Sequence, residues 1–238
     1  LLALILGPYR AFITLSSVLI VQALFFADGG ILALGCNIFN LAFFPAFIIF
    51  PLIWKPLTGA SASRPRMTAV TILSAIVGMT MGAFMVVMQT VASGVTDLPF
   101  GPFVLFMLPI HVAIGVVEGL VTAAVFVFVS TIRPVAPTVD SRTLPKWVPA
   151  VFIATALIIG GVVSWFASSS PDGLEWSILR VTGSPEIEGG RSFLGQLMAS
   201  VQSRISFLPD YDFAHPSSGS PIPVGTSVAG VVGSLLTL

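Results

Sequence analysis

Six long apolar stretches constrain the fold of this chain more than any other feature of its sequence. Together they contain one carboxylate, Glu118, and neither lysine nor arginine. A charge at the centre of a membrane helix costs roughly 2.5–3.5 kcal/mol on insertion scales, so this partition is typical of segments that cross a bilayer. Their continuous apolar character argues against a β-barrel, whose strands alternate. We therefore predict full membrane spans at 11–27, 31–54, 67–92, 102–132, 147–167 and 222–238.

The predicted fold class is an all-α integral membrane protein, a polytopic helical bundle with an external loop domain. Residues 1–6, LLALIL, are apolar but shorter than the roughly 20 residues that a span needs. They also lack the basic region and cleavage site of a signal peptide. We expect them to be the end of a seventh span, truncated at its N-terminus.

Composition excludes other classes of protein. Only 8% of the residues are charged, against about 25% in soluble domains, and the formal net charge is zero. This composition argues against a soluble fold, a nucleic-acid-binding protein and a disordered chain. The single cysteine, Cys36, leaves no disulfide framework and no cysteine-based zinc site.

Basic residues in the short loops predict the orientation. Seven of them lie at Arg10, in 55–66 and in 133–146, whereas the alternate loops 28–30 and 93–101 contain none. The positive-inside rule places the basic loops in the cytoplasm of a multi-pass protein of the inner (cytoplasmic) membrane. The loop 168–221, which holds six of the ten acidic residues, is then extracytoplasmic.

The chain divides into two predicted blocks. Residues 1–132 form a membrane domain, and 133–146, rich in proline and polar residues, form a cytoplasmic linker. Residues 147–238 form a two-helix hairpin around the long external loop. A loop of this length is either functional or partly disordered.

A polar layer is predicted in the outer third of the membrane. At 1.5 Å per helical residue, four polar side chains reach similar depths on the predicted spans, close to the turn at Asp28. One interpretation is a capture site that opens to the outside. The alternative is hydrogen bonding between helices, worth about 0.6 kcal/mol on average. The four residues are Gln22, Asn37, Asn40 and His111.

Glu118 lies near the middle of the membrane, on the same helix face as His111. The two are ~10 Å apart along the axis, too far for a direct hydrogen bond. Glu118 is either a relay or pathway residue, or a neutral acid that ties helices together, with Thr122 as a partner. Two glycine pairs, Gly78-x3-Gly82 and Gly115-x3-Gly119, predict close helix packing.

Other candidate sites are weaker. Asp210, Asp212 and His215, with Tyr211 between them, form either a loose divalent-cation site or a solvated loop. The chain has no Walker, G-x-S-x-G, H-E-x-x-H or GxGxxG motif, so we predict no enzymatic activity and no ATP hydrolysis of its own. Active transport would then draw energy from another subunit or from an ion gradient.

The first block resembles the membrane substrate-capture components of energy-coupling-factor transporters for nickel and cobalt. The resemblance rests on Gly7-Pro8, Gln22-Ala23-Leu24, Asp28-Gly29-Gly30 and Leu34-Gly35-Cys36-Asn37 with Asn40. It continues in LPIHVAIGVVEGLVTAAV, which carries His111, Glu118, Gly119 and Thr122. The second block contains the signature of a small accessory subunit of the same transporters, Pro171-Asp172-Gly173-Leu174-Glu175, followed by PDYDF at 209–213.

The resemblance implies a fusion of a metal-capture component with its accessory subunit. The transported substrate would be Ni2+ or Co2+, with no permanently bound cofactor. The metal ligands of the family, an N-terminal Met-His and a later histidine, would precede Leu1. Expected partners are a transmembrane scaffold subunit, two ATPase subunits and membrane lipid, with no nucleic acid. The alternatives are a structural or regulatory membrane subunit that binds no metal and, third, an enzyme using His111 and Glu118.

Overall fold

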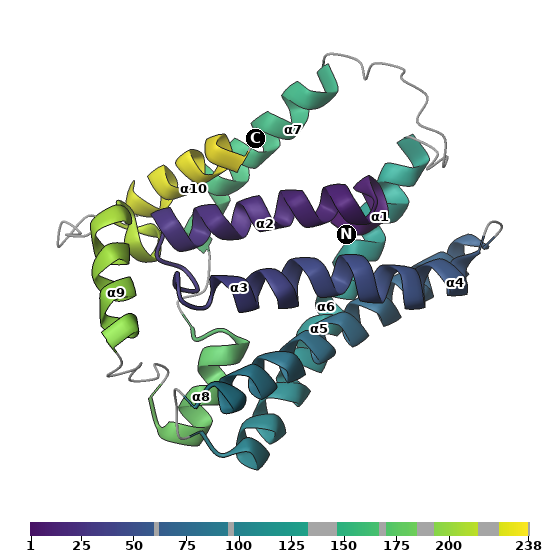
Figure 1. Cartoon of the computed structure of the whole chain (residues 1–238). Coiled ribbons are helices and arrows are strands. Elements are labelled where there is room, and N and C mark those ends of the chain that lie inside the picture. Colours follow the sequence, from purple (N-terminus) through teal and green to yellow (C-terminus); the bar gives the residue numbers. More distant parts are fainter. Residues whose placement is uncertain are drawn as a thin grey trace. The chain divides into compact units, whose positions relative to one another are not determined.

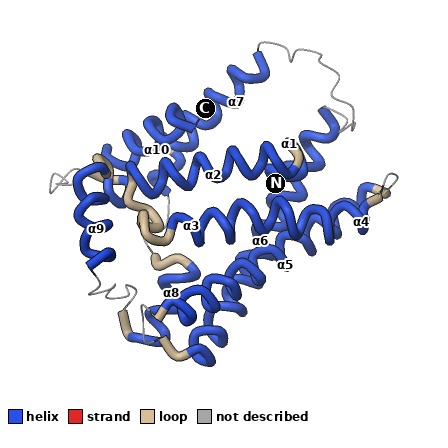
Figure 2. The backbone as a smooth tube through the Cα atoms, viewed as in Figure 1, coloured by secondary structure: helices blue, strands red, loops and turns tan. Residues whose placement is uncertain are grey.

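Every regular element that the structure describes is a helix, as Figures 1 and 2 show. The structure is a computed structural model, and it describes residues 1–59, 62–94, 98–132, 147–166, 170–184, 193–213 and 224–237. The all-helical fold class predicted from the sequence is confirmed for these residues.

Four helical segments are long and apolar enough to cross a membrane. They are α2 (Pro8–Phe25), a continuous segment over Leu34–Thr58, α5 (Arg64–Ser93) and α6 (Phe100–Ile132). They correspond to the predicted spans 11–27, 31–54, 67–92 and 102–132. A short helix, α1 (Leu2–Leu6), precedes α2.

The other two predicted spans are shorter as helices. Over 147–167 the structure has α7 (Trp147–Gly161) and the 3-10 turn η3 (Val163–Phe166), and over 222–238 it has α10 (Val224–Thr237). With 14 residues α10 is ~21 Å long, less than the ~30 Å hydrocarbon core of a bilayer. The structure therefore supports four spans among the described residues, and the count of six remains a prediction.

The second long segment is not a uniform α-helix. It begins as α3 (Leu34–Asn37), continues through the π-helical turns η1 (Ile38–Phe43) and η2 (Pro45–Trp54), and ends as α4 (Lys55–Thr58). Pro45 and Pro51 lie in η2. Because proline has no backbone N–H, it cannot close the hydrogen bonds of a regular α-helix.

The described chain forms two compact units, and each draws on both predicted blocks. The first comprises Leu1–Ser16, Gly35–Ala136 and Pro171–Arg191, and the second comprises Ser17–Leu34, Pro137–Ser170 and Ser192–Leu238. The helix α2 contributes its first half to the first unit and its second half to the second.

In the first unit α5 and α6 pack along each other (Figure 1). A Cβ atom on Gly115 would lie 2.9 Å from Cα of Ile76, and one on Gly119 would lie 3.0 Å from Cα of Ile72. Only glycine allows so close a backbone approach, so the predicted role of this pair is confirmed. A buried cluster lies at one end of this packing: Ala83, Val87, Leu98, Phe103, Met107 and Ile178, the last from α8 (Gly173–Thr182).

In the second unit α7 packs against α10, with Gly160 against Gly230. This unit also contains α9 (Phe193–Ile205) and the 3-10 turn η4 (Pro209–Tyr211). Its buried cluster joins Phe26, Leu208 and Ala229.

Large apolar side chains are exposed along the long helices. On α6, Leu105, Val117 and Phe128 are 65%, 63% and 63% exposed. Apolar surface of this extent is typical of a face that contacts lipid.

Candidate functional site

The turn Asp28-Gly29-Gly30 begins three residues after Phe25, the last residue of α2. Ala27, Gly29 and Gly30 have positive φ angles of 57°, 75° and 69°, a region that glycine enters without strain. Gln22, in the last turn of α2, donates from Nε2 to Oδ2 of Asp28 over 3.2 Å. The turn thus folds back onto the end of the helix that precedes it.

Tyr211 completes a polar trio with Gln22 and Asp28. Its hydroxyl donates to Oδ2 of Asp28 at 2.5 Å and accepts from Nε2 of Gln22 at 3.1 Å. Its ring stacks on Phe26, with centroids 5.0 Å apart. Burial, and then the hydrogen bond to Asp28, raise the pKa of Tyr211 above its usual value, so the phenol stays neutral and donates.

The backbone around Tyr211 is docked on the same helix end. Leu208 N–H donates to the carbonyl of Phe25 at 3.3 Å, and Asp210 N–H donates to that of Phe26 at 2.9 Å. Gln202 bridges the two sides of the turn, because its Oε1 accepts from Ile31 N–H at 3.2 Å and its Nε2 donates to the Ala23 carbonyl at 3.4 Å. Gln202 was not among the predicted site residues, and the sequence grouped Tyr211 with His215 rather than with Asp28.

The hypothesis of a cation site at Asp210, Asp212 and His215 falls partly outside the described residues, because His215 is not described. Asp212 accepts from Phe213 N–H through Oδ1, and Asp210 has a left-handed φ of 52°. The cation site remains a prediction.

Asn40 and Gln89 form a reciprocal amide pair in the first unit. Asn40 Nδ2 donates to Gln89 Oε1 at 2.7 Å, and Gln89 Nε2 donates to Asn40 Oδ1 at 3.4 Å. Asn40 is 3% exposed, and its partner lies on α5. This hydrogen bond joins η1 to α5, and a capture role for Asn40 remains a prediction. Gln89 is an amide within a predicted span, but it was not among the predicted site residues.

The predicted polar layer spans both compact units. Asn37 ends α3 and is half-buried in the first unit, which also holds Asn40 and His111. Gln22 belongs to the second unit. The common depth of the four side chains therefore remains a prediction.

His111 lies under the first residue of α8. Its Nδ1 is 2.7 Å from the Met107 carbonyl. A carbonyl only accepts, so Nδ1 carries the proton of this hydrogen bond. A Cβ atom on Gly173 would lie 2.9 Å from Cε1 and 3.2 Å from Nε2 of this ring. The imidazole thus occupies the space into which a side chain at residue 173 would extend.

The motif Pro171–Glu175 begins α8 as a capping box. Oδ1 of Asp172 accepts from the backbone N–H groups of Leu174 and Glu175, both at 2.8 Å. Oε2 of Glu175 accepts in return from Asp172 N–H at 3.1 Å. Each carboxylate satisfies backbone donors that a helix start leaves unpaired.

The rest of α8 packs on the first block. Ile178 is buried in the cluster with Met107 and Phe103, and Leu174 packs against that cluster. Trp176 meets Phe106 of α6 edge-on, with ring centroids 5.9 Å apart.

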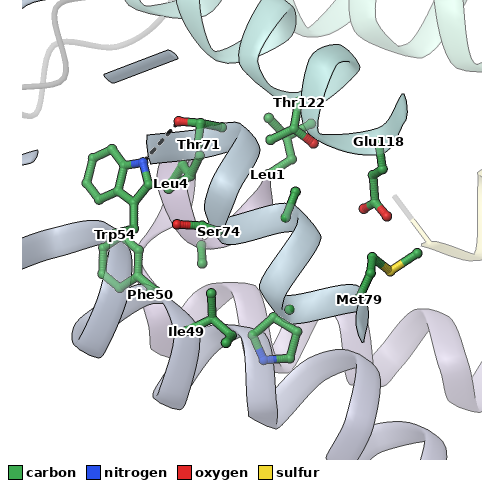
Figure 3. A pocket seen from close by; sticks show the side chains of 14 residues that line it. Leu1, Leu4, Ile49, Phe50, Trp54, Thr71, Ser74, Met79, Glu118 and Thr122 are labelled. Atoms are coloured by element: carbon green, nitrogen blue, oxygen red, sulfur yellow. Dashed lines mark hydrogen bonds between the residues drawn. The ribbon is translucent and has the colours of Figure 1, made fainter. Parts of the chain in front are cut away.

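Glu118 lines a cavity of about 120 Å3 in the first unit, shown in Figure 3. The cavity also reaches Leu1, Ser74, Thr71 and Thr122, and Thr71 accepts a hydrogen bond from Trp54 at 3.1 Å. Among the described residues no hydrogen bond joins Glu118 to Thr122, the partner that the sequence suggested. The role of Glu118 remains a prediction.

No cluster of three or more histidine, cysteine, aspartate or glutamate residues that could hold a metal ion occurs in the described part of the chain. The sequence placed the ligands before Leu1, which also remains a prediction.

Comparison with known families identifies the first block. The family model described as cobalt uptake substrate-specific transmembrane region, CbiM, matches residues 1–136, more than half of the chain. The chain belongs to the CbiM family. A second model, the PDGLE domain, matches residues 146–238, so this CbiM-family chain joins the two regions in one polypeptide.

Three curated relatives are fused proteins of the same kind. The putative fused nickel transport protein NikMN of Archaeoglobus fulgidus is 26% identical over 99% of this chain and 71% of its own length. The probable LarMN of Lactiplantibacillus plantarum is 28% identical over 74% and 56%, and NikMN of Rhodobacter capsulatus is 28% identical over 61% and 47%. The chain thus spans about half the length of the last two. No solved structure matches it.

These matches confirm the resemblance drawn from the sequence. The family and the named relatives are transport proteins and not enzymes, so the prediction of no enzymatic activity is confirmed as well.

Proposed function

We propose that this CbiM-family chain is the membrane substrate-binding component of an energy-coupling-factor (ABC-type) transporter that imports Ni2+ or Co2+. Its family and the nickel transport proteins similar to it support metal transport. The observation that carries the proposal is the hydrogen bond between Tyr211 of the PDGLE region and Asp28 of the CbiM region.

That contact sets an acidic segment beside the Asp28 turn. In the predicted orientation the turn and the loop 168–221 both face outside, where the loop holds most of the acidic residues of the chain. A divalent cation that approaches from outside is attracted by this charge. The final nitrogen ligands would come from residues before Leu1, and a square-planar nitrogen set suits Ni2+.

Energy would come from partner subunits. The sequence has no nucleotide-binding motif, so we propose a transmembrane scaffold subunit and two ATPase subunits as partners. The chain would lie in the inner membrane, surrounded by lipid. The metal is the transported substrate, and no resident cofactor is proposed.

The test is metal uptake by the chain with its natural upstream residues, produced together with its scaffold and ATPase subunits in cells that lack nickel and cobalt uptake. We expect accumulation of radioactive nickel or cobalt that is lost when the ATPases are inactivated. Titration of the purified chain with each metal by calorimetry distinguishes a substrate-binding component from a structural or regulatory subunit. The latter would bind neither metal, and that result would overturn the proposal.

A further inference from the structure

The PDGLE motif has two carboxylates in five residues, a composition that suggests a cation site or a surface for a protein partner. In the structure both are already engaged in starting α8, because Asp172 caps two backbone N–H groups and Glu175 accepts from Asp172 N–H. Carboxylate oxygens that hold a helix start have fewer lone pairs free for an ion.

The glycine between the two carboxylates, Gly173, is explained by the space available to it. At residue 173 any Cβ atom would meet Cε1 of His111 and Cδ1 of Ile114, both at 2.9 Å. Both of these atoms belong to α6, so the glycine is required by the neighbouring helix rather than by its own backbone conformation.

His111 presents a fixed surface to this glycine. Its Nδ1–H is held by the Met107 carbonyl one turn earlier, which limits rotation of the ring. Beyond the glycine, Ile178 enters the buried cluster of α5 and α6, and Trp176 packs on Phe106. The first turn of α8 is thus seated on the imidazole, and the following turns are held by apolar packing.

We propose that PDGLE is a docking motif that binds the PDGLE region to helix α6 of the CbiM region. Its carboxylates cap the start of α8, and its glycine lets that start pack against the His111 ring. His111 is then the residue of α6 on which the motif docks. The carboxylates act through helix capping and not as metal ligands. The expected effect on uptake rests on the proposed function, whereas the docking does not.

The docking is measured by crosslinking in the full chain. Phe106→Cys and Trp176→Cys are introduced in a Cys36→Ser background, and a protease site is placed within 133–146. A short bis-maleimide then joins the two halves, so that they stay together on a gel after cleavage. Failure of the otherwise unchanged chain to crosslink would overturn the docking.

A conservative pair of substitutions separates capping from metal binding. Asn caps a helix as well as Asp does, and Gln replaces Glu in a capping box. We therefore expect Asp172→Asn with Glu175→Gln to keep crosslinking within about twofold and to retain nickel uptake, lowered at most by the loss of two of the six acidic charges in the loop. Asp172→Ala with Glu175→Ala should lose about tenfold in crosslinking, as for the loss of ~1.4 kcal/mol. If the conservative pair abolishes uptake but keeps crosslinking, the carboxylates act as ligands and the proposal is wrong.

The contact itself is tested by a steric swap. Gly173→Ala should reduce crosslinking about tenfold or more, a loss of about 1.4 kcal/mol or more, because the added Cβ overpacks the contact with α6. Adding His111→Ala removes the ring, and the terminal Cδ1 of Ile114 can then rotate away from the new Cβ, so this change should restore most of the crosslinking. Gly78→Ala is the control, since a Cβ there meets only Ile49 side-chain atoms at 3.6 Å and 3.9 Å. A Gly173→Ala chain that crosslinks normally, or one that His111→Ala does not rescue, would refute His111 as the residue on which the motif docks, whatever the uptake assay gives.

Discussion

An amide within an apolar helix bundle is costly unless it is paired, and Asn40 is paired with Gln89. Asn40→Leu leaves the half-buried Gln89 amide without its partner. We expect the free energy of unfolding in detergent to fall by about 1–3 kcal/mol, measured by denaturant or thermal unfolding.

The double variant Asn40→Leu with Gln89→Leu removes both polar groups and should recover most of that loss. If the double variant instead loses as much stability as the two single variants added together, the two amides are not coupled.

Tyr211 provides a second test at the residue scale. Tyr211→Phe keeps the ring stacked on Phe26 and removes only the hydrogen bonds to Asp28 and Gln22. Because the site is partly exposed, we expect a loss of about 1 kcal/mol, or roughly fivefold, in docking of the segment at Asp28 and in metal uptake. The control is Tyr9→Phe, since Tyr9 is 74% exposed and should tolerate the change. Equal uptake by both variants would contradict a role for the trio.

The pKa of Tyr211 also sets a pH dependence. Because its pKa is raised on folding, the neutral phenol contributes stability that is complete below the ordinary tyrosine pKa of about 10 and decreases as the pH rises through the folded-state value. In a pH series above 9, unfolding of the unchanged chain should therefore lose stability more steeply than that of Tyr211→Phe. Parallel pH profiles would contradict this assignment.

At the scale of the element, α6 depends on close approach to α5. Gly119→Ala would set a Cβ 3.0 Å from Cα and 3.1 Å from the carbonyl oxygen of Ile72, both backbone atoms that cannot move aside. We expect a loss of about 1–3 kcal/mol despite the better helix propensity of alanine. Gly78→Ala, in the middle of α5 with ordinary contacts only, should be neutral or slightly stabilising, and thermal unfolding in detergent compares the two.

Sequence pattern predicted the long helices and the Gly115/Gly119 packing well, because apolar run length and small-residue spacing report directly on helix burial. The same spacing wrongly predicted close packing at Gly78 and Gly82, because a Cβ atom on either residue would have only ordinary contacts, the nearest at 3.6 Å. The start of α8 was predictable in principle: aspartate followed three residues later by glutamate is a capping-box pattern, and this signal was overlooked.

At the scale of the whole molecule, the predicted orientation can be tested directly. In a Cys36→Ser background, Ser170→Cys should react with a membrane-impermeant maleimide in intact cells, because 168–221 is predicted to be outside. Ser63→Cys, in the predicted cytoplasmic loop 55–66, should react only after the cells are lysed. The reverse pattern of labelling would overturn the orientation.

The contacts that link the two family regions could not be predicted from the sequence pattern. Asp28 and Tyr211 are separated by 183 residues, and the spacing of residues within either segment carries no information about a partner so distant. The sequence therefore indicated Asp28, Tyr211, His111 and the PDGLE motif separately, but it did not pair Asp28 with Tyr211 or the PDGLE motif with His111.

Each compact unit contains residues from both family regions, and this affects how the chain can be divided. If the polypeptide were cut within 133–146, neither fragment would hold a complete core: α8 supplies Ile178 to one unit, and the segment that follows α2 supplies Phe26 to the other. The two fragments would then fold by associating, and the yield of folded protein would depend on their concentrations. A covalent link between the regions removes that dependence, because it fixes their ratio at one to one.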